Sequence, residues 1–314
     1  MLEIRNFIGN RFIAPDSADW IDVYEPATGH VYARVANASR EDVNHAVDAA
    51  RHAFPSWSRS TAELRASLLN RVADQIEARA SEFAEAESRD SGKPLSLAAE
   101  IEIPRAISNF RFFAAAATQF ASESHSMANH AINYTLRQPL GVVACISPWN
   151  LPLYLLTWKI APALACGNSV VAKPSELTPL TASLLGEVFI EAGVPEGVLN
   201  MVHGSGPRAG AGIVEHRDIK AVSFTVSTAT GRIIAESTAS QFKKLSLEMG
   251  GKNPTIVFAD CDFDKALEGV LRSAFSNQGQ ICLCGSRILI EESIYEKFRN
   301  ELTHQAMQLH PEDP

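Results

Sequence analysis

Residues 141 to 176 read GVVACISPWNLPLYLLTWKIAPALACGNSVVAKPSE, and this stretch decides the fold class. Two apolar runs of strand length, Val142 to Ser147 and Ser169 to Lys173, flank a helical stretch from Leu153 to Ala165. A strand, a helix and a second strand in this order form a βαβ unit, in which the helix crosses over between two parallel strands. The sequence therefore predicts an α/β fold, built on a Rossmann-like parallel sheet with flanking helices.

The same alternation continues toward the C-terminus. We expect strands at Leu199 to His203, Ala221 to Thr225, Lys244 to Glu248 and Thr255 to Phe258, and helices at Pro179 to Ala192, Pro207 to Glu215, Ala229 to Ser240 and Phe263 to Ser276. A strand at Ser286 to Glu291 and a helix at Tyr295 to Gln308 then open a second α/β unit, which we expect to be incomplete at Pro314.

The N-terminal part reads differently, as short strands followed by helices. Phe7 to Tyr24 predicts strands and turns, with Gly9-Asn10 as a hairpin candidate. Ser39-Arg40-Glu41-Asp42 is typical of a capped helix start and precedes a helix over Val43 to Ala53. Apolar spacing of three and four residues predicts two further helices, at Thr61 to Arg79 and Leu95 to Phe120.

Charge and composition exclude several classes of protein. The chain has 314 residues, enough for two domains, and a formal net charge of -8 with no basic cluster, which argues against a nucleic-acid partner. The charged N-terminus shows no export signal, so we expect a cytoplasmic protein. The most apolar stretch, Leu151 to Ala165, contains Lys159 and is too short to span a bilayer, so no membrane association is expected.

The five cysteines have no spacing typical of a disulfide framework or a zinc site. We therefore interpret each as a free thiol and expect no metal.

Lys173-Pro174-Ser175-Glu176 follows a predicted parallel strand, at the edge where open α/β sheets bind ligands. Lys173 can reach a ribose or a phosphate. Glu176 can accept hydrogen bonds from adenosine-ribose hydroxyls and repels a 2′-phosphate, which favours NAD over NADP. The alternative is an ordinary helix start with an acidic first turn.

Two further turns are candidates for binding a dinucleotide. Gly204-Ser205-Gly206-Pro207 lies between a strand and a helix and fits a glycine-rich fingerprint, although no acidic residue follows at the usual distance. Residues 224 to 231, FTVSTATG, place hydroxyl side chains where free backbone N–H groups can hold an anion. The alternatives are a tight turn and a common Ser/Thr N-cap.

Residues 277 to 284, NQGQICLC, place Cys282 directly after a glycine turn, where a sulfur can be presented on irregular backbone. Cys284 is the rival nucleophile, and a buried structural thiol is the alternative for either. Glu248 ends a strand beside two glycines and can swing as a general base acting through water. Asn150 can direct its amide at a developing oxyanion, or simply form a turn.

Taken together, these segments resemble the aldehyde dehydrogenase superfamily. The resemblance lies in residues 146–150 (ISPWN), 173–176 (KPSE), 204–207 (GSGP), 224–225 (FT), 247–254 (LEMGGKNP) and 277–282 (NQGQIC). It implies that Cys282 is the nucleophile, that Asn150 forms the oxyanion hole with the Cys282 N–H, and that Glu248 is the base for deacylation. It also implies cofactor contacts at Ile146, Trp149, Lys173, Glu176, Gly206, Phe224 and Ser227.

The activity implied is NAD-dependent oxidation of an aldehyde to a carboxylic acid through a cysteine thiohemiacetal and a thioester. Within the superfamily, residues 91–96 (SGKPLS), 102–105 (EIPR) and 282–284 (CLC) resemble the 2-hydroxymuconic and 2-aminomuconic semialdehyde dehydrogenases. We hypothesise that Arg105, on the inner face of its helix, binds the remote carboxylate of a semialdehyde acid. The alternative is a surface ion pair with Glu100 or Glu102.

The resemblance also implies a domain organisation. Residues 1–121 and 141–253 correspond to the NAD-binding domain, 122–140 to an extended oligomerisation segment, and 254–314 to the start of a C-terminally truncated catalytic domain. The family's full-length form is expected to be a homodimer or homotetramer. Val226 departs from the family's glycine, which places cofactor affinity in doubt, and it would be strained if its φ were positive.

Two other functions stay open. A truncated chain is compatible with a catalytically silent remnant that at most binds NAD or a full-length partner. A weaker alternative is a thiol esterase that uses Cys282 and Glu248 without a cofactor.

Overall fold

The structure, a computed structural model, describes residues 1–128, 130–309 and 314. Its centre is a seven-stranded sheet in the order β12-β11-β8-β9-β10-β2-β3. The strands are β2 (Asn6–Ile8), β3 (Arg11–Ile13), β8 (Val142–Ile146), β9 (Ser169–Lys173), β10 (Leu199–Met201), β11 (Ile219–Val226) and β12 (Lys244–Met249). The five strands from β8 to β12 pair in parallel, which confirms the predicted Rossmann-like α/β sheet.

The N-terminal strands extend this sheet in a way that the sequence did not indicate. Strand β2 pairs antiparallel with β10 through Met201 and Phe7, and the β2–β3 hairpin makes the sheet mixed. Gly9 and Asn10 both have φ of +55°, which suits the tight turn predicted at that position.

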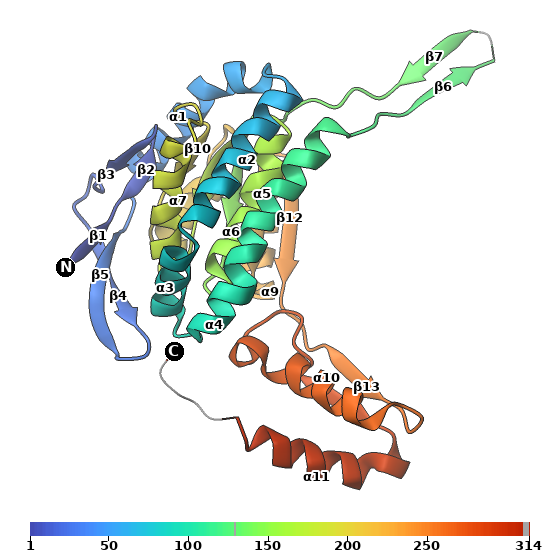
Figure 1. The fold of residues 1–314 in the computed structure, drawn as a ribbon. Coiled ribbons are helices and arrows are strands. Elements are labelled where there is room, and N and C mark those ends of the chain that lie inside the picture. The colour runs from blue at the N-terminus through green and yellow to red at the C-terminus, as the bar shows by residue number, and fades with distance from the viewer. Residues whose placement is uncertain (129, 310–313) are drawn as a thin grey trace.

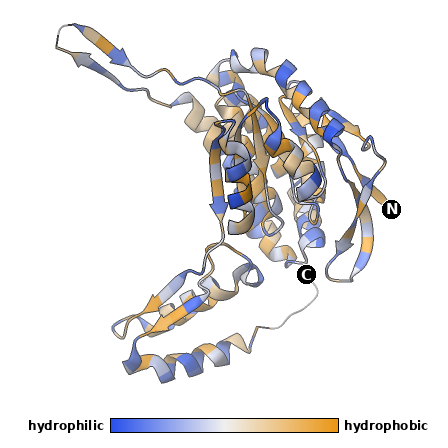
Figure 2. Cartoon of the chain, turned by 180° about the vertical axis from the view of Figure 1, so that it is seen from behind, coloured by the Kyte–Doolittle hydropathy of each residue, from blue (hydrophilic) through white to orange (hydrophobic). Residues whose placement is uncertain are grey.

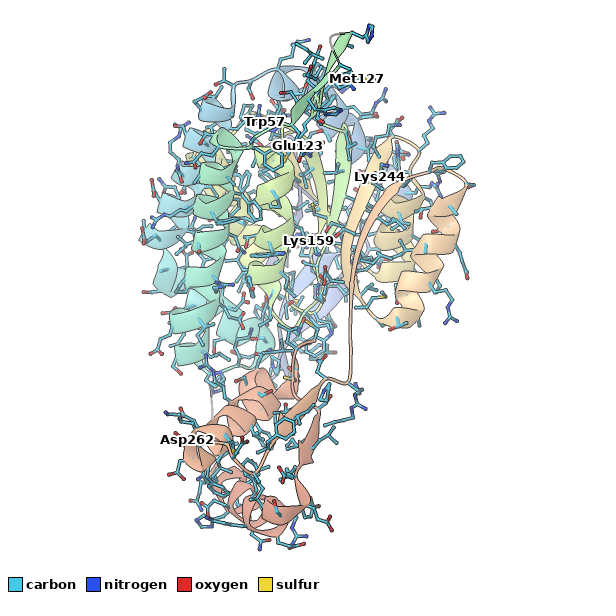
Figure 3. The ribbon with its side chains drawn as sticks, turned by 90° about the vertical axis from the view of Figure 1, so that its right-hand side faces the viewer. Trp57, Glu123, Met127, Lys159, Lys244 and Asp262 are labelled. Atoms are coloured by element: carbon cyan, nitrogen blue, oxygen red, sulfur yellow. The ribbon has the colours of Figure 1, made fainter. Side chains whose placement is uncertain are left out.

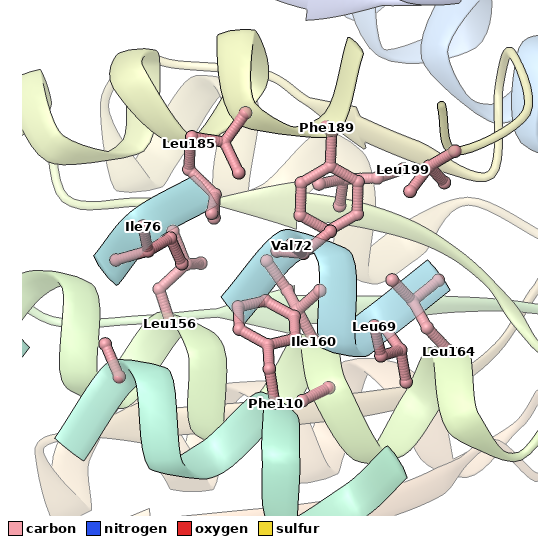
Figure 4. Close-up of a cluster of buried hydrophobic side chains, with 14 of the residues drawn as sticks. Leu69, Val72, Ile76, Phe110, Leu156, Ile160, Leu164, Leu185, Phe189 and Leu199 are labelled. Carbon is pink, nitrogen blue, oxygen red and sulfur yellow. The ribbon is translucent and has the colours of Figure 1, made fainter. Parts of the chain in front are cut away.

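Helices cover both faces of the sheet, because side chains alternate along each buried strand. Val143 and Cys145 of β8 point into one hydrophobic cluster, while Val142, Ala144 and Ile146 point into another. The first cluster is formed mainly with α2, α5, α6 and α7, and Figure 4 shows its interlocking side chains. The second is formed with α1, α8 and α9. The helices are α1 (Arg40–Ser58), α2 (Ala62–Ala78), α3 (Ala80–Ser91), α5 (Ile103–Thr118), α6 (Pro152–Ala165), α7 (Leu180–Glu191), α8 (Ala211–Glu215) and α9 (Thr228–Ala239).

Most helices begin where the sequence predicted. Ser39 caps α1 through a capping box with Asp42, and the Thr61 side chain caps α2. The continuous helix predicted at 95–120 is wrong in detail, since α4 (Leu95–Leu97) and a π-helical turn, η1 (Ala98–Glu102), precede α5. A second π-helical turn, η2 (Gly206–Gly210), precedes α8. Helix α3 was not predicted.

Two smaller sheets lie outside the central one. Strands β1 (Leu2–Ile4), β5 (His30–Ala36) and β4 (Trp20–Glu25) form a three-stranded sheet. Strands β6 (Ser124–Met127) and β7 (Ala131–Tyr134) form an antiparallel hairpin whose residues in both strands are exposed. Figure 1 shows this hairpin projecting away from the rest of the molecule.

The C-terminal part forms a separate small unit below the central sheet in Figure 1. Strands β13 (Pro254–Val257) and β14 (Arg287–Ile290) pair in parallel, and α10 (Phe263–Phe275) and α11 (Tyr295–Ala306) pack on them. Two short 3-10 turns, η3 (Ser276–Gly279) and η4 (Glu292–Ile294), connect these elements. Figure 2 shows hydrophobic residues on this two-stranded sheet as well as in the central core. Among the described residues, no helix is long and apolar enough to cross a membrane.

Candidate cofactor site and active site

A cavity of about 680 Å³ lies at the carboxyl ends of β8, β9 and β11. Its volume falls in the range of cofactor sites, roughly 300–1,000 Å³. The seven residues expected to contact a cofactor all line it: Ile146, Trp149, Lys173, Glu176, Gly206, Phe224 and Ser227. They meet because the ends of neighbouring parallel strands share one edge of the sheet.

Lys173 and Glu176 form a charged pair in this cavity. Nζ of Lys173 donates to Oε2 of Glu176 at 3.0 Å and to the carbonyl oxygen of Pro174 at 3.2 Å. Lys173 is only 4% exposed, and this burial lowers the pKa of its ammonium group, while Glu176 partly opposes the shift. The lysine is thus held by its neighbours, and the more exposed Glu176 keeps an oxygen available for hydroxyl donors.

His203 lies at the end of the neighbouring strand and is fully buried. Burial, and then the charge of Lys173, lower the pKa of His203 to about 3. Its imidazole is therefore neutral at ordinary pH, and Lys173 is the cation on this side of the cavity.

The cavity also contains groups suited to an anion and to hydroxyl-rich ligands. Ser227 caps α9 through the Thr230 N–H, so the first turn of that helix faces the cavity. Oγ of Ser147 and Oγ1 of Thr225 are buried without a hydrogen-bond partner, although both residues line the cavity. Nothing lies within 4 Å of a Cβ placed on Gly206, which leaves room for a ligand there. These features fit a dinucleotide.

Val226 lines the same cavity beside Ser227. It is not among the residues with positive φ, so the backbone strain considered from the sequence does not arise. The expected effect of Val226 on cofactor binding therefore depends on the volume of its side chain.

One wall of the cavity was not predicted from the sequence. That wall is made by residues of α8 and α9, namely Ala211, Val214, Glu215, Thr230, Ile233, Ile234 and Ser237. Their helices were predicted, but an apolar helix face looks the same whether it meets a core or a ligand.

Cys282 is exposed in the loop between η3 and β14, whereas Cys284 is buried. The turn before it is unusual, because Asn277, Gln278 and Gly279 have φ values of 50°, 55° and 73°. Two consecutive non-glycine residues in this region cost energy and are typical of functional turns. Of the two rival thiols, only Cys282 is accessible to a substrate.

Asn150 reaches the Cys282 loop from the end of β8. Its Nδ2 donates to the carbonyl oxygen of Gln280 at 2.7 Å. Its own carbonyl oxygen accepts from Nδ2 of Asn277 at 2.9 Å and from Nζ of Lys93 at 3.2 Å. The structure therefore brings together the predicted oxyanion residue and the predicted nucleophile loop.

Glu248 lies near the end of β12, paired in register with Thr225, and is exposed. Its charge raises the pKa of the buried Lys159 of α6, although burial dominates and lowers that pKa overall. Lys159, labelled in Figure 3, belongs to α6, which covers the same face of the sheet as α2, α5 and α7. Within the described chain, no hydrogen bond joins Glu248 to Cys282.

Arg105 is exposed, which corrects its expected place on the inner face of α5. Its guanidinium lies 5.4 Å from the centre of the Tyr154 ring, and it donates to the Tyr154 hydroxyl at 3.4 Å. The alternative ion pair with Glu102 is not formed, because Glu102 is buried and binds Lys93. In the described parts of the chain, no group of His, Cys, Asp or Glu side chains has the arrangement of a metal site.

Several known proteins are similar to this chain in sequence and structure. The chain matches the aldehyde dehydrogenase family over residues 12–314. It is 51% identical over 298 residues to the 2-aminomuconic semialdehyde dehydrogenase of Danio rerio, and this match covers 95% of the chain and 61% of that relative. It is 50% identical over 323 residues to the 2-hydroxymuconic semialdehyde dehydrogenase of Pseudomonas sp. (strain CF600), covering 100% of the chain and 66% of the relative.

A solved NAD+ complex of an aldehyde dehydrogenase from Bacillus cereus superposes with a TM-score of 0.96 at 40% identity, covering 98% of this chain and 63% of that one. The chain thus spans a little under two thirds of the length of these relatives.

Proposed function

Because the chain belongs to the aldehyde dehydrogenase family, we propose that it provides the NAD site and the nucleophile for oxidation of an aldehyde to a carboxylic acid. The observation that carries this proposal is the contact between Asn150 and Gln280, which holds an amide donor beside an exposed cysteine. The cavity with its seven expected cofactor residues lies at the same edge of the sheet.

The proposed cofactor is NAD, and its chemical contribution when bound is to accept a hydride. Lys173 and Glu176 would hold the adenosine ribose, and Ser227 with the first turn of α9 would hold the pyrophosphate. Glu176 favours NAD over NADP because its carboxylate repels a 2′-phosphate. A solved relative carries NAD+, which supports this choice.

Each of the proposed catalytic residues would have a distinct role. Sγ of Cys282 adds to the aldehyde carbon, and a tetrahedral oxyanion forms. Asn150 has two amide hydrogens: one donates to Gln280, which orients the group, and the other is available for the oxyanion. The backbone N–H of Cys282 is the second donor. After oxidation leaves a thioester on Cys282, Glu248 removes a proton from the water that hydrolyses it.

The proposed substrate class is a semialdehyde that carries a second, remote carboxylate. The relatives with 51% and 50% sequence identity are named as dehydrogenases of muconic semialdehydes. Arg105 is exposed and steadied by the Tyr154 ring, so its guanidinium is available to bind a carboxylate in a bidentate manner.

The proposed domain organisation assigns the central sheet and the β1-β5-β4 sheet to one domain. Residues 1–121 and 141–253 would form the NAD-binding domain, with 122–140 as an oligomerisation segment and 254–314 as the start of a catalytic domain. Assembly would be that of a homodimer or homotetramer, through the exposed β6–β7 hairpin.

The test is to incubate the purified chain with NAD and an aldehyde and to follow NADH absorbance at 340 nm. Cys282→Ala should abolish NADH formation, whereas the matched control Cys284→Ala should retain it, since its sulfur is buried. Loss of activity in the Cys284 variant alone would overturn the assignment. Ester hydrolysis by the Cys282 thiol without NAD would indicate an esterase instead.

A second candidate function is NAD binding without turnover. It is favoured by the small C-terminal unit, whose strands leave Ile256 58% and Leu289 51% exposed. Such apolar faces are usually covered by further structure. Saturable NAD binding by calorimetry, together with no NADH formation from any aldehyde tested, would select this function.

A further inference from the structure

Three ionisable side chains form a buried cluster beneath the Asn150 loop. Glu87 of α3 is fully buried. Lys93, which lies between α3 and α4, and Glu102, the last residue of η1, are each 1% exposed. Nζ of Lys93 pairs with Oε1 of Glu102 and lies 3.7 Å from Oε1 of Glu87. A buried ion pair adds little stability compared with apolar side chains of similar size, and it often costs some. Stability alone is therefore a poor explanation for this cluster.

The cluster has one contact that points outward, toward the candidate active site. Nζ of Lys93 donates to the carbonyl oxygen of Asn150, and Nδ2 of Asn277 donates to the same oxygen. Asn277 begins the left-handed turn that leads to Cys282, and it is 5% exposed. A single carbonyl oxygen thus joins the buried cluster, the loop of the oxyanion donor and the turn of the nucleophile.

We propose that Lys93 is a positioning residue that fixes the Asn150 loop against the Cys282 turn. The proposal rests on the function proposed above and adds a residue to its oxyanion site. An ammonium group has three donors, and here the carboxyl groups of Glu102 and Glu87 and the Asn150 carbonyl surround Nζ of Lys93. These neighbours restrict where the ammonium group can donate to the Asn150 carbonyl.

The electrostatics of the cluster agree with this geometry. Burial and the nearby Glu102 raise the pKa of Glu87 well above its ordinary value, which favours its neutral form. Glu102, whose Oε1 pairs with Nζ of Lys93, is the partner that holds the ammonium group. Glu87 also accepts from the Leu153 N–H at 3.4 Å, which connects the cluster to the start of α6 on the other side of Asn150.

The decisive experiment separates positioning from stability by replacing the ion pair with apolar side chains. Lys93→Met alone leaves Glu102 buried without a partner and will lower the Tm. The double variant Lys93→Met with Glu102→Met removes both charges, so its Tm should return to within a few degrees of the unmodified chain. We expect kcat for aldehyde oxidation to stay reduced about tenfold to a hundredfold in both, with an unchanged KM for NAD.

The matched control is Arg65→Met. Arg65, like Lys93, donates to a backbone carbonyl, but its acceptor is Ala165 at the end of α6, whereas Asn150 lies just before the start of that helix. This variant should lose Tm and keep kcat. If the Lys93 and Glu102 double variant recovers kcat together with Tm, the cluster has only a structural role and the proposal is wrong.

A measurement that needs no turnover distinguishes failure of this inference from failure of the proposed function. Hydrogen exchange should become faster in both residues 147–153 and 276–284 in the double variant, while β9 stays protected. Alkylation of Cys282 by iodoacetamide, followed by mass spectrometry, should change in rate in the same variant. If the unmodified chain forms no NADH but the double variant shows this paired loosening, the enzyme assignment is refuted and the positioning role is supported. Unchanged exchange in both segments of the double variant would refute the positioning role.

Discussion

Val226 is the residue whose volume most directly affects the cofactor site. It follows Phe224 and Thr225 at the end of β11, and its side chain lines the cavity next to the cap of α9. Its φ is not positive, so the residue fits the backbone. Any cost to cofactor binding must therefore come from the side chain and not from strain.

Shortening Val226 should consequently tighten NAD binding. We expect both Val226→Ala and Val226→Gly to lower the Kd for NAD several-fold, equivalent to about 1 kcal/mol, because space beside the pyrophosphate site becomes free. Isothermal titration calorimetry measures this directly. The alanine variant controls for the extra backbone freedom of glycine, and an unchanged Kd in both would show that Val226 does not crowd the ligand.

Arg105 carries the prediction about substrate class. Arg105→Ala should lower kcat/KM for a semialdehyde acid by tenfold or more, because a charge-assisted bidentate contact of about 1.5–3 kcal/mol is lost. Turnover of an uncharged aldehyde should change little. Tyr154→Phe is the matched control, since it keeps the ring beneath the guanidinium and removes only the 3.4 Å hydroxyl contact. Equal losses for both substrates would contradict the assignment.

At the level of elements, Asp90 near the end of α3 joins three parts of the fold. The hydroxyl of Tyr32 of β5 donates to Oδ1 of Asp90, and the N–H of Leu180 at the start of α7 donates to Oδ2 at 2.7 Å. Asp90 is 2% exposed. Burial raises the pKa of its carboxyl group to about 7, although both hydrogen bonds and the Arg89 charge oppose the shift.

This shift makes stability depend on pH through a group whose folded pKa lies above its unfolded pKa. The contribution of Asp90 to the free energy of unfolding is fully present below about pH 3.8. It is lost as the pH rises to about 7. The size of the pKa shift corresponds to a loss of roughly 4 kcal/mol in the free energy of unfolding. Urea unfolding of the chain should show this fall between about pH 4 and pH 7, and Asp90→Asn should flatten it. An identical slope in the variant would show that other groups cause the dependence.

Considered as a whole molecule, the chain leaves apolar surface uncovered at its periphery. In the β6–β7 hairpin, Ile132 is 74% and Tyr134 67% exposed. The hairpin contacts no other sheet in the described chain, so its backbone edges are open to pairing. An exposed apolar hairpin of this kind favours association between copies.

We expect the chain to self-associate as its concentration rises, as seen by sedimentation velocity. Changing Ile132→Lys together with Tyr134→Lys should shift the distribution toward monomer without lowering the Tm, because neither side chain contributes to the core. Leu64→Lys, at an exposed leucine of α2, is the matched control and should leave association unchanged. Persistent association in the hairpin variant would locate the contact elsewhere, for example on β13 and β14.

The sequence by itself determined the parallel sheet and the capped helix starts, and its resemblance to a family predicted the residues that line one part of the cavity. It could do so because these features have local signatures. Strand and helix periodicities repeat over a few residues, and a strand's carboxyl end fixes where Lys173 or Phe224 will lie. The sequence could not decide which of Cys282 and Cys284 is the nucleophile, because the burial of a side chain depends on tertiary packing.

Only the tertiary structure decided which distant residues meet. The antiparallel joining of β2 to β10, the cavity wall from α8 and α9, and the outward position of Arg105 have no local signal. The same holds for Lys93, whose contact with the Asn150 carbonyl spans 57 residues, and for Asn277, whose contact with it spans 127. Such contacts depend on how whole helices and strands pack together. The residues next to each contact in the sequence do not determine that packing.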